Sequence, residues 1–432
     1  MDKTSIPKLL IKLSPPVMLA LLIQSIYNIV DSFFVGQYSQ EGLTALSIIF
    51  PVQLLITAVS TGTGTGINIL ISGMDGAGDL KNPDRIIKNG LFLGVFNFLV
   101  FAVIGLLSMK GYYQISSGQA VVREYGMDYG YIILIFSLGI FLEANFTKIL
   151  QARGNMFVPM CAQVTGAIIN CLLDPLLIFG RAGFPQMGVR GAAAATVIGQ
   201  WAAMFIVGIC VLKKYPLRGK ISLKTCLHIY KTGAASIVMQ SLYTLYIVGL
   251  NLILKQFTEN AVTVLGIYYK IQTFFFIPMM GLQQVILPII SFNCGAGRED
   301  RVRQTVRYSV AASAILMTAA VTVFMAVPGA LVRIFSDSPE VISIGCTAFR
   351  IISVSFIPAA AVMIMTVYFQ GIGRGKISIL ITVLRQVFLL VPLAWLLHFF
   401  GLEFVWITFP ATEIIVVIVT LRLYAKNRLV YS

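Results

Sequence analysis

Charged residues are scarce in this sequence of 432 residues. Asp, Glu, Lys and Arg together make up 11% of it, whereas hydrophobic residues make up 58%. The mean hydropathy of +0.88 lies far above the range of soluble globular domains. The lack of charge therefore excludes a soluble globular protein and predicts one that is solvated by a lipid bilayer.

Catalytic and metal-binding groups are also scarce. The two histidines, His228 and His398, lie at the edges of loops, and the six cysteines lack the paired spacing of a metal site or a disulfide framework. The Gly- and Thr-rich run from Ser60 to Gly66 lies within an apolar segment and has no Lys-Ser/Thr pair of a phosphate-binding loop, so we expect it to allow close helix packing or a kink. The sequence thus predicts a protein that is not an enzyme, holds no cofactor and does not use ATP.

Long apolar runs fill most of the chain instead. A run of about 20 residues is enough to cross a hydrocarbon core of about 30 Å, and short polar stretches separate twelve such runs. They cover approximately residues 16–36, 43–73, 90–109, 127–152, 157–180, 191–212, 233–254, 261–293, 308–332, 345–370, 377–400 and 403–421. We therefore predict an all-α membrane protein with twelve transmembrane helices.

The net charge of +15 does not indicate a nucleic acid partner, because the basic residues lie between the apolar runs and not on a soluble domain. The termini and every second loop hold 22 of the 32 Lys and Arg residues, the opposite loops hold 6, and 4 lie within the runs. By the positive-inside rule, both termini are cytoplasmic. We predict a multi-pass protein of the bacterial inner membrane.

The two halves of the chain resemble each other. Gly76-Ala77-Gly78 matches Gly295-Ala296-Gly297 at an offset of 219 in the numbering, and the segment around Arg153 matches the segment around Arg374 at an offset of 221. Pro175 and Pro392 follow at an offset of 217. Three matches in one order at nearly one offset indicate an internal repeat of six helices.

The most basic loop lies between the two repeats and sets the predicted domain boundaries. We predict an N-terminal lobe at 1–212, a cytoplasmic linker at 213–232 and a C-terminal lobe at 233–432. Because six helices return the chain to the same side of the membrane, the lobes are parallel repeats. Two such lobes commonly hold a substrate near the midplane and move against each other, so the pattern predicts a secondary transporter.

Four carboxylates lie within the predicted helices: Asp31, Glu143, Asp174 and Glu413. A charged side chain at the centre of a membrane helix costs about 2.5–3.5 kcal/mol on insertion scales. A functional or paired role is therefore the default expectation for each of them.

Asp31 shares one face of the first helix with three other polar residues. Gln24, Tyr27, Asn28 and Asp31 lie at positions i, i+3, i+4 and i+7, which places them on one side over two turns. This face is a candidate functional site, and the alternative is a polar seam that only packs helices. Pro16 opens the same helix and either permits bending there or simply starts the helix.

The fifth helix carries a second candidate site. Asn170 lies one turn before Asp174 on the same face, and Pro175 cannot donate to the preceding turn, so backbone oxygen is freed beside a carboxylate. A carboxylate, an amide oxygen and free carbonyl oxygens suit a proton or a small hard cation. No other metal ion is indicated.

The second half places bases within its helices, namely Lys270, Arg350 and Arg385. Glu413 is the exception among them. An ion pair between Glu413 and one of these bases is the simplest explanation for charged residues of both signs within these helices.

Several of these residues together resemble a known family. They are Pro16, Gln24, the segment Asn28-Ile-Val-Asp31-Ser-Phe-Phe-Val-Gly36, Gly76-Ala-Gly78, Asn170-Cys-Leu-Leu-Asp174-Pro175 and Gly191-Ala-Ala-Ala-Ala-Thr196. The chain resembles the multidrug and toxic compound extrusion (MATE) family over about residues 15–425, and within it the bacterial MepA-type branch.

The resemblance implies an antiporter that expels cationic, amphipathic compounds in exchange for H⁺ or Na⁺. It implies that Asp31, Asn170, Asp174 and Thr196 gather the coupling cation, and Thr196 rests on the resemblance alone. It also implies that Gln24 and Tyr27 face the substrate cavity, and we assign Asn28 on the same helix to substrate binding with them.

The second half departs from one branch of the family. NorM-like members carry acidic residues in their seventh and tenth helices, whereas here 233–254 has no carboxylate and 345–370 offers only Arg350. We therefore place ion coupling in the N-terminal lobe.

Other functions need residues that the sequence does not offer. A lipid-linked oligosaccharide flippase of the same superfamily is the main alternative, and it should line its cavity with Arg and Lys to hold pyrophosphate. An intramembrane enzyme needs a nucleophile with its base, or a metal cluster. The sequence favours a monomeric transporter whose partners are small organic cations.

Overall fold

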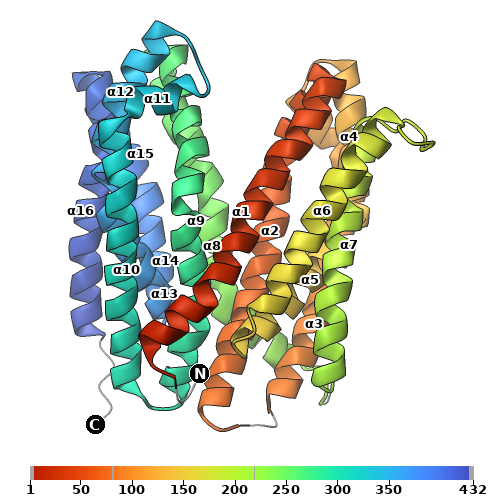
Figure 1. The fold of residues 1–432 in the computed structure, drawn as a ribbon, viewed down its shortest axis with the longest axis vertical. Coiled ribbons are helices and arrows are strands. Elements are labelled where there is room, and N and C mark those ends of the chain that lie inside the picture. Colours follow the sequence, from red (N-terminus) through yellow and green to blue (C-terminus); the bar gives the residue numbers. More distant parts are fainter. Residues whose placement is uncertain (1–3, 80–81, 218, 428–432) are drawn as a thin grey trace. The chain divides into compact units, whose positions relative to one another are not determined.

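The computed structural model describes residues 4–79, 82–217 and 219–427, and within these ranges the chain forms helices joined by short turns, with no strand (Figure 1). The prediction of an all-α protein is confirmed. Four of the basic residues used in the charge count, Lys3, Lys81, Arg218 and Arg428, lie outside the described residues.

The helices follow the predicted apolar runs in order. In the first half they are α1 (Ile6–Tyr38), α2 (Gln40–Gly76), α3 (Asn82–Ser116), α4 (Ala120–Ile135), α5 (Leu138–Ala152), α6 (Phe157–Phe179) and α7 (Val189–Lys214). In the second half they are α8 (Leu223–Leu254), α9 (Glu259–Gly295), α10 (Glu299–Ala326), α11 (Pro328–Arg333), α12 (Pro339–Ser353), α13 (Phe356–Gly371), α14 (Gly375–Val383), the π-helix η1 (Leu384–Leu390), α15 (Val391–Leu397), the 3₁₀-helix η2 (His398–Phe400) and α16 (Leu402–Lys426).

Ten helices of the described chain are long and apolar enough to cross a membrane, and the number rises to twelve if each of two bent pairs is one span. The pairs are α4 with α5, bent by 45°, and α12 with α13, bent by 49°. At the bends, the Ser137 hydroxyl donates to the Leu134 carbonyl at 2.8 Å and the Ser355 hydroxyl donates to the Ile352 carbonyl at 2.6 Å. Because these hydroxyls compete for helix carbonyls, they favour a break at the same place in each repeat.

One predicted boundary is wrong. The ninth run, predicted as 308–332, continues past the end of α10 at Ala326. Pro328 lacks an N–H group and its ring clashes with a helical preceding turn, so the helix stops and the short α11 begins there.

The described chain divides into two compact units. One unit contains Pro15–Ile237, and the other contains the segment up to Ser14 together with Val238 and all that follows. The divisions fall inside α1 and α8, so the first part of each helix belongs to the unit of the other repeat. The lobe boundaries at 1–212, 213–232 and 233–432 stay a prediction.

Hydrogen bonds inside each unit support the repeat. In the first unit the Ser72 hydroxyl donates to the Ala152 carbonyl at 3.1 Å, and in the second the Ser291 hydroxyl donates to the Gly371 carbonyl at 3.0 Å. Both pairs are related by the repeat offset that Gly76 and Gly295 show in the sequence. The side chains of Ser39 and Thr258, separated by the same offset, cap α2 and α9.

Close helix contacts determine where the polar residues of the first unit lie. A side chain at Gly64 would meet Lys148 Cγ at 2.7 Å, so the Ser60–Gly66 run lets α5 pack tightly on α2, as predicted. Gly166 of α6 and Gly199 of α7 face each other's backbone, and a Cβ on Gly199 would lie 2.6 Å from the Gly166 carbonyl oxygen. Glycine is required there because two helix backbones touch.

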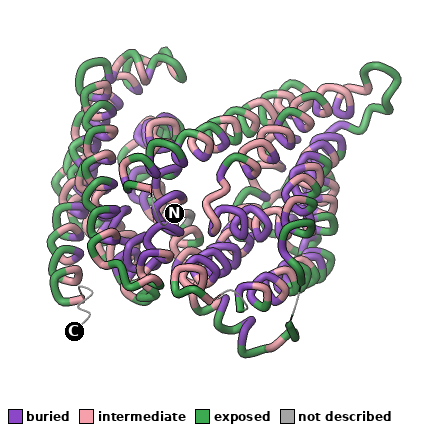
Figure 2. The backbone as a smooth tube through the Cα atoms, turned by 60° about the horizontal axis from the view of Figure 1, so that its bottom comes forward, coloured by how far each residue is buried: buried purple, intermediate pink, exposed green. Residues whose placement is uncertain are grey.

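The helices bury one side inside their unit and expose the other, as the alternation of colours along each helix shows (Figure 2). The exposed sides carry large apolar side chains, for example Leu99, Leu107 and Ile104 on α3. An apolar outer surface suits hydrocarbon better than water.

Candidate functional site

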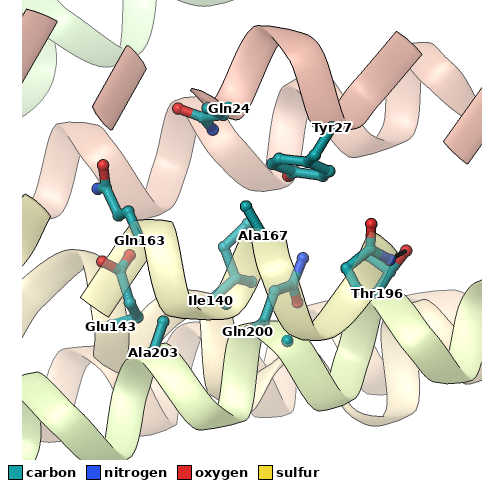
Figure 3. Close-up of a pocket in the computed structure, with 12 residues that line it drawn as sticks. Gln24, Tyr27, Ile140, Glu143, Gln163, Ala167, Thr196, Gln200 and Ala203 are labelled. Carbon is teal, nitrogen blue, oxygen red and sulfur yellow. Dashed lines mark hydrogen bonds between the residues drawn. The ribbon is translucent and has the colours of Figure 1, made fainter. Parts of the chain in front are cut away.

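A cavity opens within the Pro15–Ile237 unit between α1, α5, α6 and α7. Its volume is about 100 Å³, which accommodates several water molecules. Pockets for drug-sized ligands measure about 300–1,000 Å³. The polar side chains that line the cavity are Gln24, Tyr27, Glu143, Gln163, Asn170, Thr196 and Gln200 (Figure 3).

The predicted ion-site residues of α6 and α7 are in contact. The Asn170 amide donates to Asp174 Oδ1 at 3.3 Å and to the Thr196 hydroxyl at 3.4 Å. Asp174 is fully buried and Asn170 is 2% exposed. The Gly166–Gly199 contact brings α6 and α7 close enough for this bridge, since the Cβ of Asn170 lies beside Gly199.

Asp31 joins this group from α1. Its charge acts on Asp174 of α6 and on Tyr27, which lies one turn before it on α1, so Asp31 lies near the ion-site residues. Asp31 Oδ1, Asn170 Oδ1 and Asp174 Oδ2 are buried and have no hydrogen-bond partner among the described residues. All three unpartnered atoms are acceptors, and a buried acceptor requires a donor or a cation.

The predicted substrate residues of α1 separate into two sets. Gln24 and Tyr27 line the cavity and point toward α6 and α7 (Figure 3). Asn28 is exposed and does not line it, and its carbonyl accepts a hydrogen bond from the Ser32 hydroxyl at 2.9 Å.

The two prolines predicted as kinks lie within unbroken helices. α1 continues through Pro16, and α6 continues through Pro175. Pro175 cannot donate to Cys171, so the carbonyl of Cys171 loses its helical partner close to Asp174. The kinks themselves stay a prediction.

Sequence reasoning missed one residue of this group. Tyr129, on α4, is 2% exposed, lies near Thr196 and accepts a hydrogen bond from Gln53 at 3.1 Å. A single tyrosine in an apolar run gives no periodic signal. Only the packing of α4 against α2 and α7 places it beside the ion-site residues.

Glu143, whose role the sequence left open, lines the cavity together with Gln163 and accepts a hydrogen bond from Thr147 at 2.8 Å. Lys148, on the same helix, is 6% exposed and donates to Gln151 at 2.9 Å. The lysine therefore balances part of the acidic charge of α5 inside this unit.

The second unit confirms the predicted ion pair of Glu413. Arg385 donates to Glu413 Oε1 from Nε at 2.6 Å and from Nη2 at 2.5 Å. The other two bases take no part in this pair. Lys270 is exposed and lies over the ring of Phe335 at 5.6 Å, and Arg350 is exposed.

The described residues include no group of three or more His, Cys, Asp and Glu side chains that could hold a metal ion. The site near Asp174 instead offers two carboxylates, an amide and a hydroxyl. Such a set of oxygen atoms suits a proton or a monovalent hard cation.

A family model describes most of this chain. The MatE model matches residues 16–176 and 235–396, one segment in each repeat. The chain therefore belongs to the MatE family, the family of multidrug and toxic compound extrusion transporters. It is a membrane transporter of small molecules and not an enzyme, and the family predicted from the sequence is confirmed.

Known relatives carry transporter names. The chain is 24% identical to a protein named FAD transporter from Shewanella oneidensis, over 95% of this chain and 92% of that protein. It is 23% identical to the multidrug export protein MepA of Staphylococcus haemolyticus, over 99% and 96% of the two chains. A solved structure of a multidrug resistance MATE family transporter in an outward-facing conformation shares the fold, with a TM-score of 0.92, 22% identity and coverage of 98% and 96%.

Proposed function

We propose that this transporter is a secondary antiporter that exports organic cations in exchange for H⁺ or Na⁺, with Asp31, Asn170, Asp174 and Thr196 as its coupling site. The observation that carries the proposal is the set of three buried acceptor atoms without a donor, on Asp31, Asn170 and Asp174. A proton or a sodium ion supplies what these oxygens lack. Two carboxylates that face each other away from water repel, so one of them takes up a proton or both share a cation.

The exchange follows from competition for one electric field. When the coupling ion leaves, the negative charge of Asp31 and Asp174 remains and favours a cationic substrate near Tyr27 and Gln24. When the ion binds, it neutralises that field and the substrate is released. The two ligands are therefore coupled through charge and need no direct contact.

The lining of the cavity supports a cationic substrate. It includes the carboxylate of Glu143 and several amide and hydroxyl groups, and no lysine or arginine is among the described residues that line it. A flippase for a pyrophosphate-linked lipid would need such bases. The cavity is too small for a drug-sized molecule, so we propose that it holds the ion and water, and that it widens when substrate binds.

The experiment that tests this function uses everted membrane vesicles. Accumulation of a cationic dye should follow an imposed gradient of protons or of sodium, and the gradient that drives it identifies the coupling ion. Vesicles without the transporter serve as the control. Dye accumulation that depends on neither gradient would refute the proposal of an antiporter.

The energy source gives a separate prediction. Dye accumulation should collapse when an ionophore removes the driving gradient, and it should be indifferent to vanadate, because the sequence has no nucleotide-binding motif. The measurement is the initial rate of dye uptake with and without each compound. Uptake that needs ATP and persists without a gradient would contradict the proposal.

We also propose that both termini are cytoplasmic and that the monomer is the transporting unit. A reporter fused after Lys220 should score as cytoplasmic and one fused after Gln114 as external, because the basic loops stay inside. The paired activities of an enzyme that works only outside and one that works only inside provide the measurement. The reverse pattern for both fusions would invert the orientation.

A further inference from the structure

The ion pair of Arg385 and Glu413 lies in the second unit, apart from the coupling site. Glu413 is 6% exposed, and Arg385 donates to only one of its oxygens, Oε1. The other oxygen, Oε2, is buried and has no partner among the described residues. The charge of the pair acts on the partly buried Tyr246 of α8. The carboxylate is therefore held by one fixed cation and keeps a free acceptor atom.

The repeat relates this pair to the cavity of the first unit. Ala167 is the eleventh residue of α6, and Arg385 is the eleventh residue counted from the start of α14. Gln200 is the twelfth residue of α7, and Glu413 is the twelfth residue of α16. Ala167 and Gln200 both line the cavity (Figure 3).

A third position agrees. Tyr27 lines the cavity, and Tyr246 follows it at the same offset that separates the capping residues Ser39 and Thr258. The cavity-lining residues Tyr27, Ala167 and Gln200 of the first unit thus correspond to Tyr246, Arg385 and Glu413 of the second unit.

The coupling residues have apolar counterparts. Asp31 corresponds to Leu250 at the offset of 219, and the Asp174-Pro175 pair corresponds to Val391-Pro392 at the offset of 217. Counted from the start of α14, as for Arg385, the counterpart of Asp174 is Pro392, which also has no carboxylate. Thr196, the eighth residue of α7, corresponds to Phe409, the eighth residue of α16. At these described positions the second unit therefore has no side-chain oxygen that would hold a coupling ion, and Glu413 is the carboxylate that lies beside Arg385.

The backbone around Arg385 is also unusual. Residues Leu384–Leu390 form a π-helix of seven residues, which is rare and is found mostly at functional sites. Arg385 lies in this wider π-helical turn, and its side chain reaches Glu413 of α16.

We propose that the second unit contains a cation site that matches the cavity of the first and is permanently filled by the guanidinium of Arg385. The site has the chemistry to hold a guanidinium or ammonium group: one carboxylate with a free oxygen, beside the partly buried Tyr246. With this site filled, only the first unit exchanges ions and substrate. The proposal builds on the coupling site given above, but its test measures binding and does not depend on transport.

The test removes the tethered cation and supplies a free one. Purified Arg385→Ala is titrated with ethylguanidinium, which replaces the lost group, and with ethylurea, a neutral molecule of the same shape. Binding is measured by calorimetry and by the melting temperature. The controls are the unchanged protein and the double variant Arg385→Ala/Glu413→Gln, which has the same space and no carboxylate.

Arg385→Ala should bind ethylguanidinium roughly ten-fold or more tightly than the double variant does, because a charge-assisted hydrogen bond to Glu413 is restored. Ethylurea should show no such preference, and the unchanged protein should bind neither compound. Equal binding to both variants, or equal binding of both compounds to Arg385→Ala, would overturn the proposal.

Arg385→Ala leaves a buried carboxylate unpaired and is at risk of failing to fold. The double variant then shows whether the fold tolerates the loss of the pair. If Arg385→Ala fails to fold, it is expressed and extracted with ethylguanidinium or with ethylurea present. Recovery of folded protein with ethylguanidinium alone supports the proposal. Failure with both compounds, while the double variant folds, contradicts it.

Discussion

Asp31→Asn and Asp174→Asn should each abolish gradient-driven export while the protein stays in the membrane. Asn keeps the shape of the side chain and removes the charge that takes up the proton or cation. The Asn170 amide, which donates to Asp174 at 3.3 Å, can still donate to the new amide oxygen, so the fold should tolerate the change. The measurement is dye accumulation in everted vesicles together with the amount of transporter in the membrane.

Asp337→Asn is the matched control, because Asp337 is exposed and lies in the other unit. It should retain the export rate of the unchanged protein. Near-normal export by both Asp31→Asn and Asp174→Asn, at equal abundance, would show that the coupling site does not lie in the first unit.

Gly199→Val should abolish export and also lower stability. A side chain at Gly199 meets the backbone of Gly166 at 2.6 Å, and no rotation of a side chain relieves this contact. α6 and α7 must therefore separate, which breaks the bridge from Asn170 to Thr196. Overpacking of this kind costs typically about 1–3 kcal/mol.

The measurements for this variant are the melting temperature in detergent and the export rate. Gly111→Val is the matched control, because nothing lies within 4 Å of a side chain at that position of α3. It should leave both quantities nearly unchanged. If Gly199→Val exported at the normal rate, the contact of α6 with α7 would not be needed for coupling.

The fold was predictable because each membrane helix carries its own signal. Apolar runs of about 20 residues must form helices in a bilayer, so the number and order of the spans follow from hydropathy. The repeat offset read from Gly76–Gly78 reappears in the hydrogen bonds of Ser72 and Ser291. The bend between α4 and α5 was not predictable, because no proline marks it and Ser137 is an ordinary residue by composition.

The site was predictable only along single helices. Asn170 and Asp174 are one turn apart, so their contact follows from helix geometry alone. Tyr129 of α4 lies near Thr196 of α7, and Arg385 pairs with Glu413, which is 28 residues away in the sequence. The periodicity of a single helix does not reveal either pair. Such partners are fixed by the packing of helices on each other, and one sequence does not show which faces meet.

The helix α1 passes from one compact unit into the other. It crosses the division at Ser14–Pro15, and Pro16 removes a backbone hydrogen bond at that point. Asp31 lies 15 residues further on, about 22 Å along the axis at 1.5 Å per residue. If α1 bends at Pro16, as the sequence predicts, a change of about 10° in the bend angle would displace Asp31 by roughly 4 Å. This displacement exceeds the length of a hydrogen bond, so it would be enough to change the groups that Asp31 contacts.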